Sequence, residues 1–286
     1  MMIDRDKAAQ ELLAFYQEAG VDALLDETPV NRFAEPAPQP NPAPAAEARA
    51  TAGPAASPPV KPAVLPPSTT SLRDAPLAPP APEAAVMAAR EAARSAPDLE
   101  TLRSILDRFE GCALRATASR LVFADGNPSA RVMLIGEAPG REEDLEGLPF
   151  VGRSGKLLDR MLAAIGLDRS SVYIANIVPW RPPGNRTPTP QETAICLPFI
   201  LRQVELVNPD ILVCLGNPST QTLLGTKEGI TKTRGRWFKF NAGSREIRAI
   251  PSYHPAFLLR SPLQKRFAWR DFLAIRKALE AATAKK

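Results

Sequence analysis

Residues 131–178, RVMLIGEAPGREEDLEGLPFVGRSGKLLDRMLAAIGLDRSSVYIANIV, contain two short apolar runs that are rich in branched residues and are separated by a segment of helical periodicity. The runs at 131–138 and 171–178 read as β-strands, and 155–165 reads as an amphipathic helix. A strand, a helix and a second strand in this order are typical of a parallel sheet whose faces are covered by helices. This stretch therefore indicates the α/β class.

The same alternation continues to the end of the chain. Further branched runs at 211–216 (ILVCLG) and 247–254 (IRAIPSYH) read as strands. Helical patterns occupy three more segments, at 191–207, 218–224 and 265–282. We predict a three-layer α/β/α sandwich with a four-stranded parallel central sheet.

The N-terminal part of the chain has a different composition. Fifteen of the 31 prolines fall within residues 36–82, where aromatic and branched residues are scarce, so this segment cannot bury enough surface to offset its ordering entropy. Before it, residues 4–25 place their apolar residues at helical spacing. We predict a short amphipathic helix within residues 1–28, a disordered Ala/Pro-rich linker at 29–85 and a folded domain at 86–286.

Charge and cysteine content narrow the functional classes. The chain carries a net charge of +5, and the positive excess lies in the folded part. This favours a polyanionic partner, although a solvated basic surface is an equally good explanation. No stretch approaches the roughly 18 apolar residues that a membrane span needs, and the N-terminus lacks the features of a secretory signal. Three cysteines without secretory context argue against a disulfide framework.

Distinctive residues follow three of the predicted strands. They are the turn GEAPG at 136–140, Asn176 and His254, the last being the single histidine of the chain. In parallel α/β sheets, ligands bind beyond the carboxyl ends of the strands. We therefore expect these residues to meet at one edge of the sheet. By itself, a lone histidine is more often a packed core residue than a catalytic one.

Two segments resemble nucleotide-binding motifs without matching them. GEAPG lacks the G-x-G-x-x-G spacing, and its proline removes a backbone donor from the turn. GLPFVGRS at 147–154 resembles a phosphate-binding loop, but Arg153 replaces the lysine and no strand leads directly into it. Neither segment indicates a nucleotide site.

Three longer segments resemble the signature motifs of the type 4 uracil-DNA glycosylases. They are GEAPGREEDLEGLPFVGRSGKLLDRML at 136–162, YIANIVPWRPPGNRTPTPQE at 173–192 and YHPAFLLR at 253–260. The resemblance extends from about Cys112 to Trp269. It implies an enzyme that flips uracil out of DNA and hydrolyses its N-glycosidic bond, which leaves an abasic site for base-excision repair.

The resemblance assigns the binding of uracil to four residues. Phe150 matches the stacking aromatic of the family, and stacking a base on a ring gains roughly 1–3 kcal/mol. Asn176 can accept a hydrogen bond from uracil N3–H and donate one to O4, whereas cytosine presents the opposite pattern. Gly136 and Ala138, from the GEAPG turn, are the other two residues that the resemblance places at the uracil-binding site. Judged by residue type alone, Phe150 could instead pack in the core and Asn176 could cap a turn.

The implied catalytic residues are Glu137 and His254, together with Asn176. Negative charge gathers on uracil as the glycosidic bond breaks, and a neutral imidazole of His254 that donates to O2 would stabilise it in the manner of an oxyanion hole. Glu137 stands where the family places a carboxylate or a water-orienting group, and it is our candidate for positioning the attacking water. The catalytic aspartate of the type 1 relatives would fall at Ala138, and their thymine-excluding tyrosine would fall at Gly140.

The same resemblance indicates the residues that hold DNA. RPPGNR at 181–186 offers cations on a proline-stiffened turn, which suits phosphate oxygens. The family inserts apolar side chains of the AFLLR segment into the duplex, so Leu258 or Leu259 would fill the space that the base leaves. These leucines could equally belong to the first turn of a buried helix. The predicted DNA-binding set is Arg181, Asn185, Arg186, Leu258, Leu259 and Arg260.

The chain departs from the family at the iron–sulfur cluster. The type 4 family usually holds a [4Fe–4S] cluster with four cysteines, of which Cys112 and Cys196 match two. Phe109 and Trp180 stand at the other two positions, and neither side chain can coordinate iron. We expect no stable cluster, no other cofactor, and aromatic side chains in the space that a cluster would occupy. Cys214 lies inside a predicted strand and reads as core.

Two classes of function fit these residues. The first is an active uracil-DNA glycosylase, and the alternative is a catalytically weak DNA-binding adaptor that recruits replication or repair partners through the N-terminal helix. The intact set of Glu137, Phe150, Asn176 and His254 favours the enzyme. We expect a monomeric hydrolase of the bacterial cytoplasm, associated with the nucleoid when it acts, with uracil-containing DNA and a protein that binds the N-terminal helix as its partners.

Overall fold

The structure, a computed structural model, describes residues 82–283, which form a mixed sheet with helices on both faces. The strand order is β1-β3-β2-β4-β6-β5. Four neighbouring central strands run parallel: β3 (Tyr173–Asn176), β2 (Val132–Gly136), β4 (Ile211–Leu215) and β6 (Glu246–Ser252). The predicted class and the parallel centre are therefore confirmed. The predicted N-terminal helix and most of the predicted linker lie outside the described residues.

The sheet has six strands, so the predicted number of four is wrong. The two additional strands lie at the edges of the sheet and are antiparallel to their neighbours. β1 (Asp125–Gly126) pairs with β3, and β5 (Phe238–Asn241) pairs with β6. β1 is only two residues long, and β5 (FKFN) is short and interrupted by a lysine. Both sequences lack the apolar run of a buried strand, as is common where one side of a strand has no neighbour.

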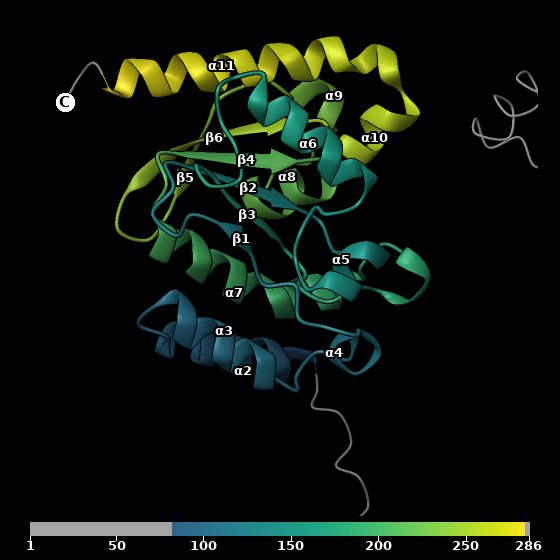
Figure 1. The fold of residues 1–286 in the computed structure, drawn as a ribbon. Helices are drawn as coiled ribbons and strands as arrows, with labels where there is room; N and C mark the ends of the chain where they lie inside the picture. The colour runs from purple at the N-terminus through teal and green to yellow at the C-terminus, as the bar shows by residue number, and fades with distance from the viewer. Residues whose placement is uncertain (1–81, 284–286) are drawn as a thin grey trace, which may run out of the picture. The chain divides into compact units, whose positions relative to one another are not determined.

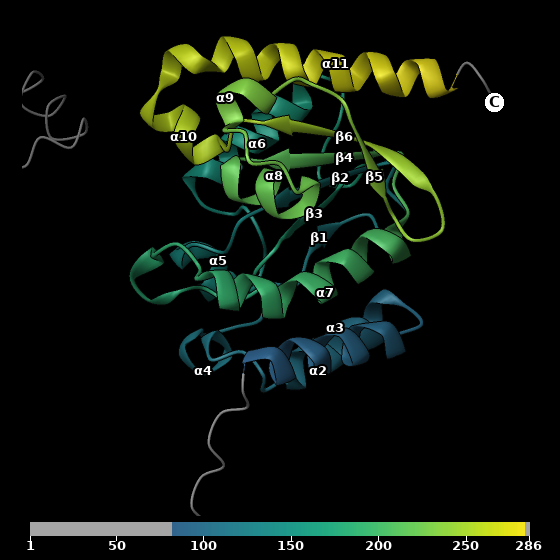
Figure 2. The same ribbon diagram turned by 180° about the vertical axis from the view of Figure 1, so that it is seen from behind.

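Helices on both faces of the sheet make the layers (Figures 1 and 2). α6 (Arg153–Ala163) and α11 (Lys265–Thr283) cover one face, and α7 (Pro190–Val207) and α8 (Asn217–Leu224) cover the other. Successive side chains of β2 point to opposite faces of the sheet. Leu134 packs in the core on the α6 and α11 face, and Ile135 packs in the core on the α7 face. The helices predicted at 155–165, 191–207, 218–224 and 265–282 are confirmed, with shifts of up to two residues at their ends.

Two further helices pack on the outer side of α7 (Figures 1 and 2). α2 (Pro82–Ser95) and α3 (Leu99–Arg108) precede the first strand, and α2 begins within the last residues of the predicted linker. The helix α2 is rich in alanine, and its Ala85, Ala89 and Ala93 are at most 3% exposed. Their spacing of four residues makes a flat stripe that allows close contact with α7.

The remaining helices within residues 82–283 are short. They are α4 (Leu114–Thr117), α5 (Arg141–Glu146), η1 (Pro183–Asn185), α9 (Ile230–Thr233), α10 (Pro255–Arg260) and η2 (Pro262–Gln264). Between Pro82 and Thr283, no helix has both the length and the apolar character needed to cross a bilayer.

The carboxyl ends of the central strands meet at one edge of the sheet. Gly136 pairs with Asn176 across β2 and β3, and Leu215 pairs with Ser252 across β4 and β6. The chain continues this register beyond the strands, because Val178 donates its backbone N–H to the carbonyl of Glu137 at 3.0 Å. Residues that immediately follow these strands are therefore brought together.

Candidate active site

A cavity of about 850 Å³ lies at this edge of the sheet. Most residues that the sequence analysis singled out line it: Glu137, Ala138, Phe150, Asn176, Asn185, Arg186, His254, Leu259 and Arg260. Three predicted residues do not line it, namely Gly136, Arg181 and Leu258. The expected clustering of the GEAPG turn, Asn176 and His254 is thus what the structure contains.

The rings of Phe150 and His254 lie side by side in the cavity wall. Their centroids are 5.4 Å apart and their planes are inclined by 32°. Gly136 lies beside this pair, since a Cβ at this position would come within 2.7 Å of Phe150 Cζ and 2.4 Å of Asn176 Oδ1. Any side chain at Gly136 would displace both neighbours, which explains the need for glycine there.

Asn176 ends strand β3 and is 4% exposed. Its Oδ1 atom is buried and has no hydrogen-bond partner within the described residues. An unpaired buried acceptor costs about 1–3 kcal/mol. A ligand with an N–H group at this place would satisfy the oxygen, so the site is suited to a molecule that donates a hydrogen bond.

His254 is the N-cap residue of helix α10, and its backbone geometry fixes its ring. Nδ1 accepts a hydrogen bond from the backbone N–H of Ala256 at 3.1 Å. Burial, followed by the charge of Arg260, lowers the pKa of His254 to about 4. The imidazole is therefore neutral at pH 7 and carries its proton on Nε2, which makes it a hydrogen-bond donor.

Glu137 and Gly216 flank these groups. Oε1 of Glu137 is buried and lacks a hydrogen-bond partner in the part of the chain that the structure describes. Burial raises the pKa of the Glu137 carboxyl above its ordinary value, which increases its affinity for a proton. Gly216 has φ +92°, and a Cβ there would lie 3.1 Å from Cβ of His254. Glycine thus lets the end of β4 come close to the histidine.

The two arginines of RPPGNR make contacts within the protein. Arg186 binds Glu192 with two hydrogen bonds of 2.8 and 2.6 Å, and Glu192 also caps α7 through the backbone N–H of Thr189. Arg181 donates to Oδ1 of Asn185 at 2.6 Å. These bonds brace the loop, so a phosphate would have to share Arg186 with Glu192.

The two leucines of AFLLR have different environments. Leu258 is fully buried and packs with Tyr253 and Ala268, whereas Leu259 is 37% exposed and lines the cavity. The prediction that Leu258 contacts DNA is therefore corrected. Helix α10 (Pro255–Arg260) packs on the protein core through this side chain, so Leu258 points away from the cavity. Leu259 remains the predicted apolar contact.

The residues at the cluster positions do not match a four-thiolate site. Sγ of Cys196 lies 4.0 Å from Sγ of Cys112, and Trp180 and Phe109 contribute rings to the same apolar cluster. The hydrogen bond with Cys112, together with burial, raises the pKa of Cys196 well above its usual value. Residues 82–283 contain no group of three or more His, Cys, Asp or Glu side chains that could hold a metal. Cys214 is buried within β4, which raises its pKa to about 12.

Several residues of the cavity wall were not predicted. They include Glu143, Arg153, Ser154, Asn217 and Tyr253. Asn217 follows strand β4, so the rule that led to Asn176 and His254 also applies to it. Glu143 is only 6% exposed and its neighbour Asp144 is 3% exposed, and the segment REED at 141–144 gives no sign that two of its three carboxylates are buried.

The fold and the site define a class of protein. The family model described as the uracil DNA glycosylase superfamily matches residues 123–274, which is more than half of the chain, and the chain belongs to this superfamily. Within it, the chain is similar to proteins named type-4 uracil-DNA glycosylase, as its three motifs predicted.

Three such relatives indicate the extent of the similarity. The protein of Thermotoga maritima is 42% identical over 164 residues, which cover 57% of this chain and 84% of the relative. That of Archaeoglobus fulgidus is 40% identical over 168 residues, with 57% and 84% covered. That of Saccharolobus solfataricus is 38% identical over 189 residues, with 64% and 88% covered.

Proposed function

We propose that this protein is a uracil-DNA glycosylase, a hydrolase that removes uracil from DNA in base-excision repair. The observation that carries the proposal is the arrangement of the Phe150 ring, the Asn176 amide and the neutral His254 imidazole around one cavity. The relatives named type-4 uracil-DNA glycosylase support it. The alternative of a DNA-binding adaptor has no comparable support, because an adaptor does not need this cavity.

In this proposal, the flipped uracil stacks on Phe150. The amide of Asn176 accepts a hydrogen bond from uracil N3–H through Oδ1 and donates to O4. The buried, unpaired state of Oδ1 supports this role, because cytosine has no N–H at position 3 and would leave the oxygen unsatisfied.

Cleavage breaks the bond between C1′ of the sugar and N1 of uracil, and the electron pair leaves with the base. His254 donates its Nε2–H to uracil O2 and stabilises the negative charge that develops there. The acceptor role of Nδ1 and the lowered pKa support a neutral donor. No proton transfer from this histidine is needed.

Water completes the reaction by adding to C1′. Glu137 orients this water and takes its proton, which leaves a hydroxyl on the sugar, while the uracil anion is protonated by solvent. The burial of Glu137 and its unpaired oxygen support this assignment. Leu259 and Arg260 lie on the cavity wall, where an exposed apolar side chain and a cation suit contact with the flanking DNA.

We further propose that the protein acts without an iron–sulfur cluster, as a monomer, in the cytoplasm. Two thiols and two aromatic rings at the cluster positions support the first point. We propose the monomeric state because one enzyme acting on one extruded base requires no symmetry. A protein partner for the N-terminal segment remains part of the proposal.

The function is tested with a labelled oligonucleotide that contains one uracil. Incubation with the protein followed by alkali should cut the strand at the uracil and leave a matched thymine oligonucleotide intact. The variant with His254→Ala and Asn176→Ala should lose the activity. Arg202→Met, which removes an arginine between α7 and the end of α2, should keep it and controls for folding. Failure of the unaltered protein to cut single- and double-stranded substrates would contradict the proposal.

A further inference from the structure

Phe150 presents its ring to the cavity from a backbone that residues with side chains rarely adopt. Its φ is +55°, in the left-handed region, and its side chain is 4% exposed. Such a conformation costs free energy and persists only where the surroundings determine it. The contacts of the loop between α5 and α6 therefore decide where the ring lies.

The amide groups of this loop are held by Glu143. Its Oε1 accepts hydrogen bonds from the backbone N–H groups of Val151 at 3.1 Å and Gly152 at 3.0 Å. Its Oε2 accepts from the backbone N–H of Gly140 at 3.0 Å. This carboxylate thus fixes the loop from the side that follows Phe150.

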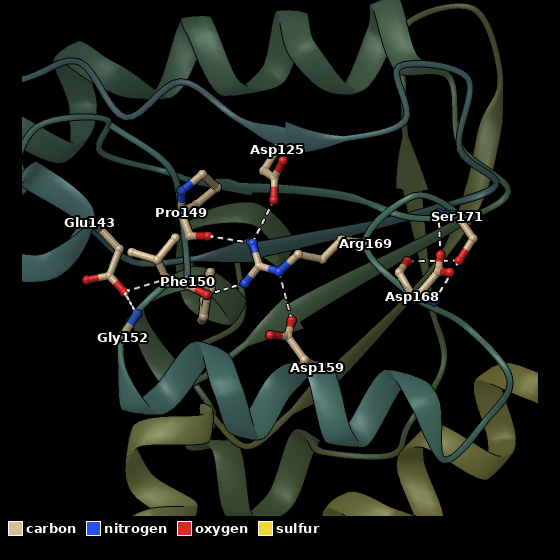
Figure 3. A network of polar contacts seen from close by, with 10 residues as sticks. Asp125, Glu143, Pro149, Phe150, Gly152, Asp159, Asp168, Arg169 and Ser171 are labelled. Atoms are coloured by element: carbon tan, nitrogen blue, oxygen red, sulfur yellow. Dashed lines mark hydrogen bonds and ion pairs between the residues drawn. The ribbon is translucent and has the colours of Figure 1, made fainter. Parts of the chain in front are cut away.

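The carbonyl groups of the loop are held by Arg169, which comes from the segment between α6 and β3 (Figure 3). Nη1 donates to the carbonyl of Pro149 at 3.1 Å, and Nη2 donates to the carbonyl of Phe150. The guanidinium is itself fixed by Asp125 on β1, through Nη1 at 2.6 Å, and by Asp159 on α6, through Nε at 2.8 Å. All three nitrogens are engaged.

Helix α6 approaches the same carbonyl closely. A Cβ at Gly155 would lie 1.6 Å from the carbonyl oxygen of Phe150, so the first turn of α6 needs glycine there. The carbonyl is therefore confined between this turn and the guanidinium. If the peptide group that contains the Phe150 carbonyl rotated, its hydrogen bond to Arg169 would break. The phenyl ring of Phe150 would then change its position as well.

We propose that Arg169 is a positioning residue that sets the stacking plane of Phe150 in the candidate uracil site. The inference rests on the proposed function, and it deepens it by naming a determinant of base affinity outside the cavity wall. Arg169 acts through Phe150, because it does not line the cavity. Lysine cannot replace it, since a single ammonium group cannot reach two adjacent carbonyls and two carboxylates at once.

A purely structural role makes different predictions. Arg169 joins β1, α6 and the loop, so its removal will also lower the free energy of unfolding. If stability were its whole role, Arg169→Met would act on folding and would leave the remaining folded enzyme with unchanged kinetics. In the positioning role, the folded Arg169→Met variant has weaker stacking, and Arg169→Lys does not restore the kinetics, because lysine cannot hold both carbonyls.

The direct test places 4-fluorophenylalanine at position 150 and records its ¹⁹F resonance in the full-length protein. We expect Arg169→Met and Arg169→Lys to shift or broaden the line, and Arg202→Met to leave it unchanged. Arg202 is a matched control because it also binds a backbone carbonyl and a carboxylate, with the same 26% side-chain exposure as Arg169. An unchanged line in both Arg169 variants would overturn the proposal, whether or not the protein excises uracil.

The kinetic test is a double-mutant cycle on uracil excision. Arg169→Met and Phe150→Leu should each lower kcat/KM by roughly tenfold, and the double variant should lose little more than either single one, because both remove the same stacking contact. Arg202→Met combined with Phe150→Leu should show the loss from Phe150→Leu alone. Fully multiplicative losses for Arg169→Met and Phe150→Leu would overturn the proposal.

Discussion

The phenyl ring of Phe150 and the imidazole of His254 lie with their centroids 5.4 Å apart, although the two residues are 104 positions apart in the chain. They come together because Phe150 leads into α6, and His254 follows strand β6. The relationship places a stacking surface beside a hydrogen-bond donor. In the proposed reaction, one holds the base and the other stabilises its negative charge.

Removal of the donor should affect the chemical step. We expect His254→Ala to lower kcat by roughly 10²- to 10³-fold, as the loss of an oxyanion-hole donor does, and to change KM little. Single-turnover excision from a uracil oligonucleotide, followed over a range of enzyme concentrations, separates the effect on the chemical step from the effect on binding. An increase in KM with an unchanged kcat would assign His254 to binding alone.

The pH dependence should reflect Glu137. The carboxylate form accepts a proton from water, and burial raises its pKa above the ordinary 4.5. Activity should therefore fall on the acid side at a pH above 4.5, and Glu137→Gln should lower the rate by roughly 100-fold and remove this limb. No inflection is expected near 6.5, because the pKa of His254 is lowered to about 4. A limb that persists in Glu137→Gln would show that another group titrates.

His254 should also make stability depend on pH. The unfolded chain binds a proton at this residue below about 6.5, while the folded protein binds it only below about 4. The contribution of His254 is complete above pH 6.5 and is lost as the pH falls towards 4. Urea unfolding of His254→Gln should show a shallower decline in this window. An equally steep decline in that variant would contradict the lowered pKa.

The adjacent leucines of α10 should respond in opposite ways. Leu258→Ala should lower the free energy of unfolding by about 2–5 kcal/mol, because it opens a cavity in a fully buried place. Leu259→Ala should change stability by less than about 0.5 kcal/mol, but it should slow excision from duplex DNA more than from single-stranded DNA. Denaturant titration and paired kinetics measure both effects. Equal losses on both substrates would argue against a role of Leu259 in base flipping.

The cluster positions give a chemical prediction. Protein purified without oxygen should be colourless in the visible range and contain far fewer than four irons per chain, because only two of the four cluster positions hold a cysteine. Cys112→Ser combined with Cys196→Ser should retain uracil excision. A brown protein with close to four irons would contradict the proposal, and it would require ligands other than the two cysteines.

The sequence predicted the centre of this fold better than its margins. β2, β3 and β4 are buried along their whole length, and β6 is buried in its second half, so these segments are mostly apolar. The edge strands β1 and β5 have no such pattern, and their pairing depends on neighbours distant in the chain. Helix α2 resembles the Ala-rich linker in composition, and only the packing of Ala85, Ala89 and Ala93 distinguishes it.

The site residues that directly follow strands were predictable from the sequence. Those whose position depends on the conformation of a loop or the rotation of a short helix were less predictable. Asn176 and His254 were found because parallel strands deliver their ends to one edge. The choice between Leu258 and Leu259 depends on how α10 is rotated about its axis relative to the core. Two adjacent leucines have the same side chain, so their sequence does not reveal this rotation. Arg169 lies outside the three family motifs, and its link to Phe150 exists only in three dimensions.

The most direct test of the central claim is a crystal structure of this protein with free uracil. Our account predicts a pyrimidine ring stacked on Phe150, with N3–H and O4 on the amide of Asn176 and O2 within hydrogen-bond distance of Nε2 of His254. Uracil bound elsewhere, or a cavity that excludes it at saturating concentration, would contradict the account.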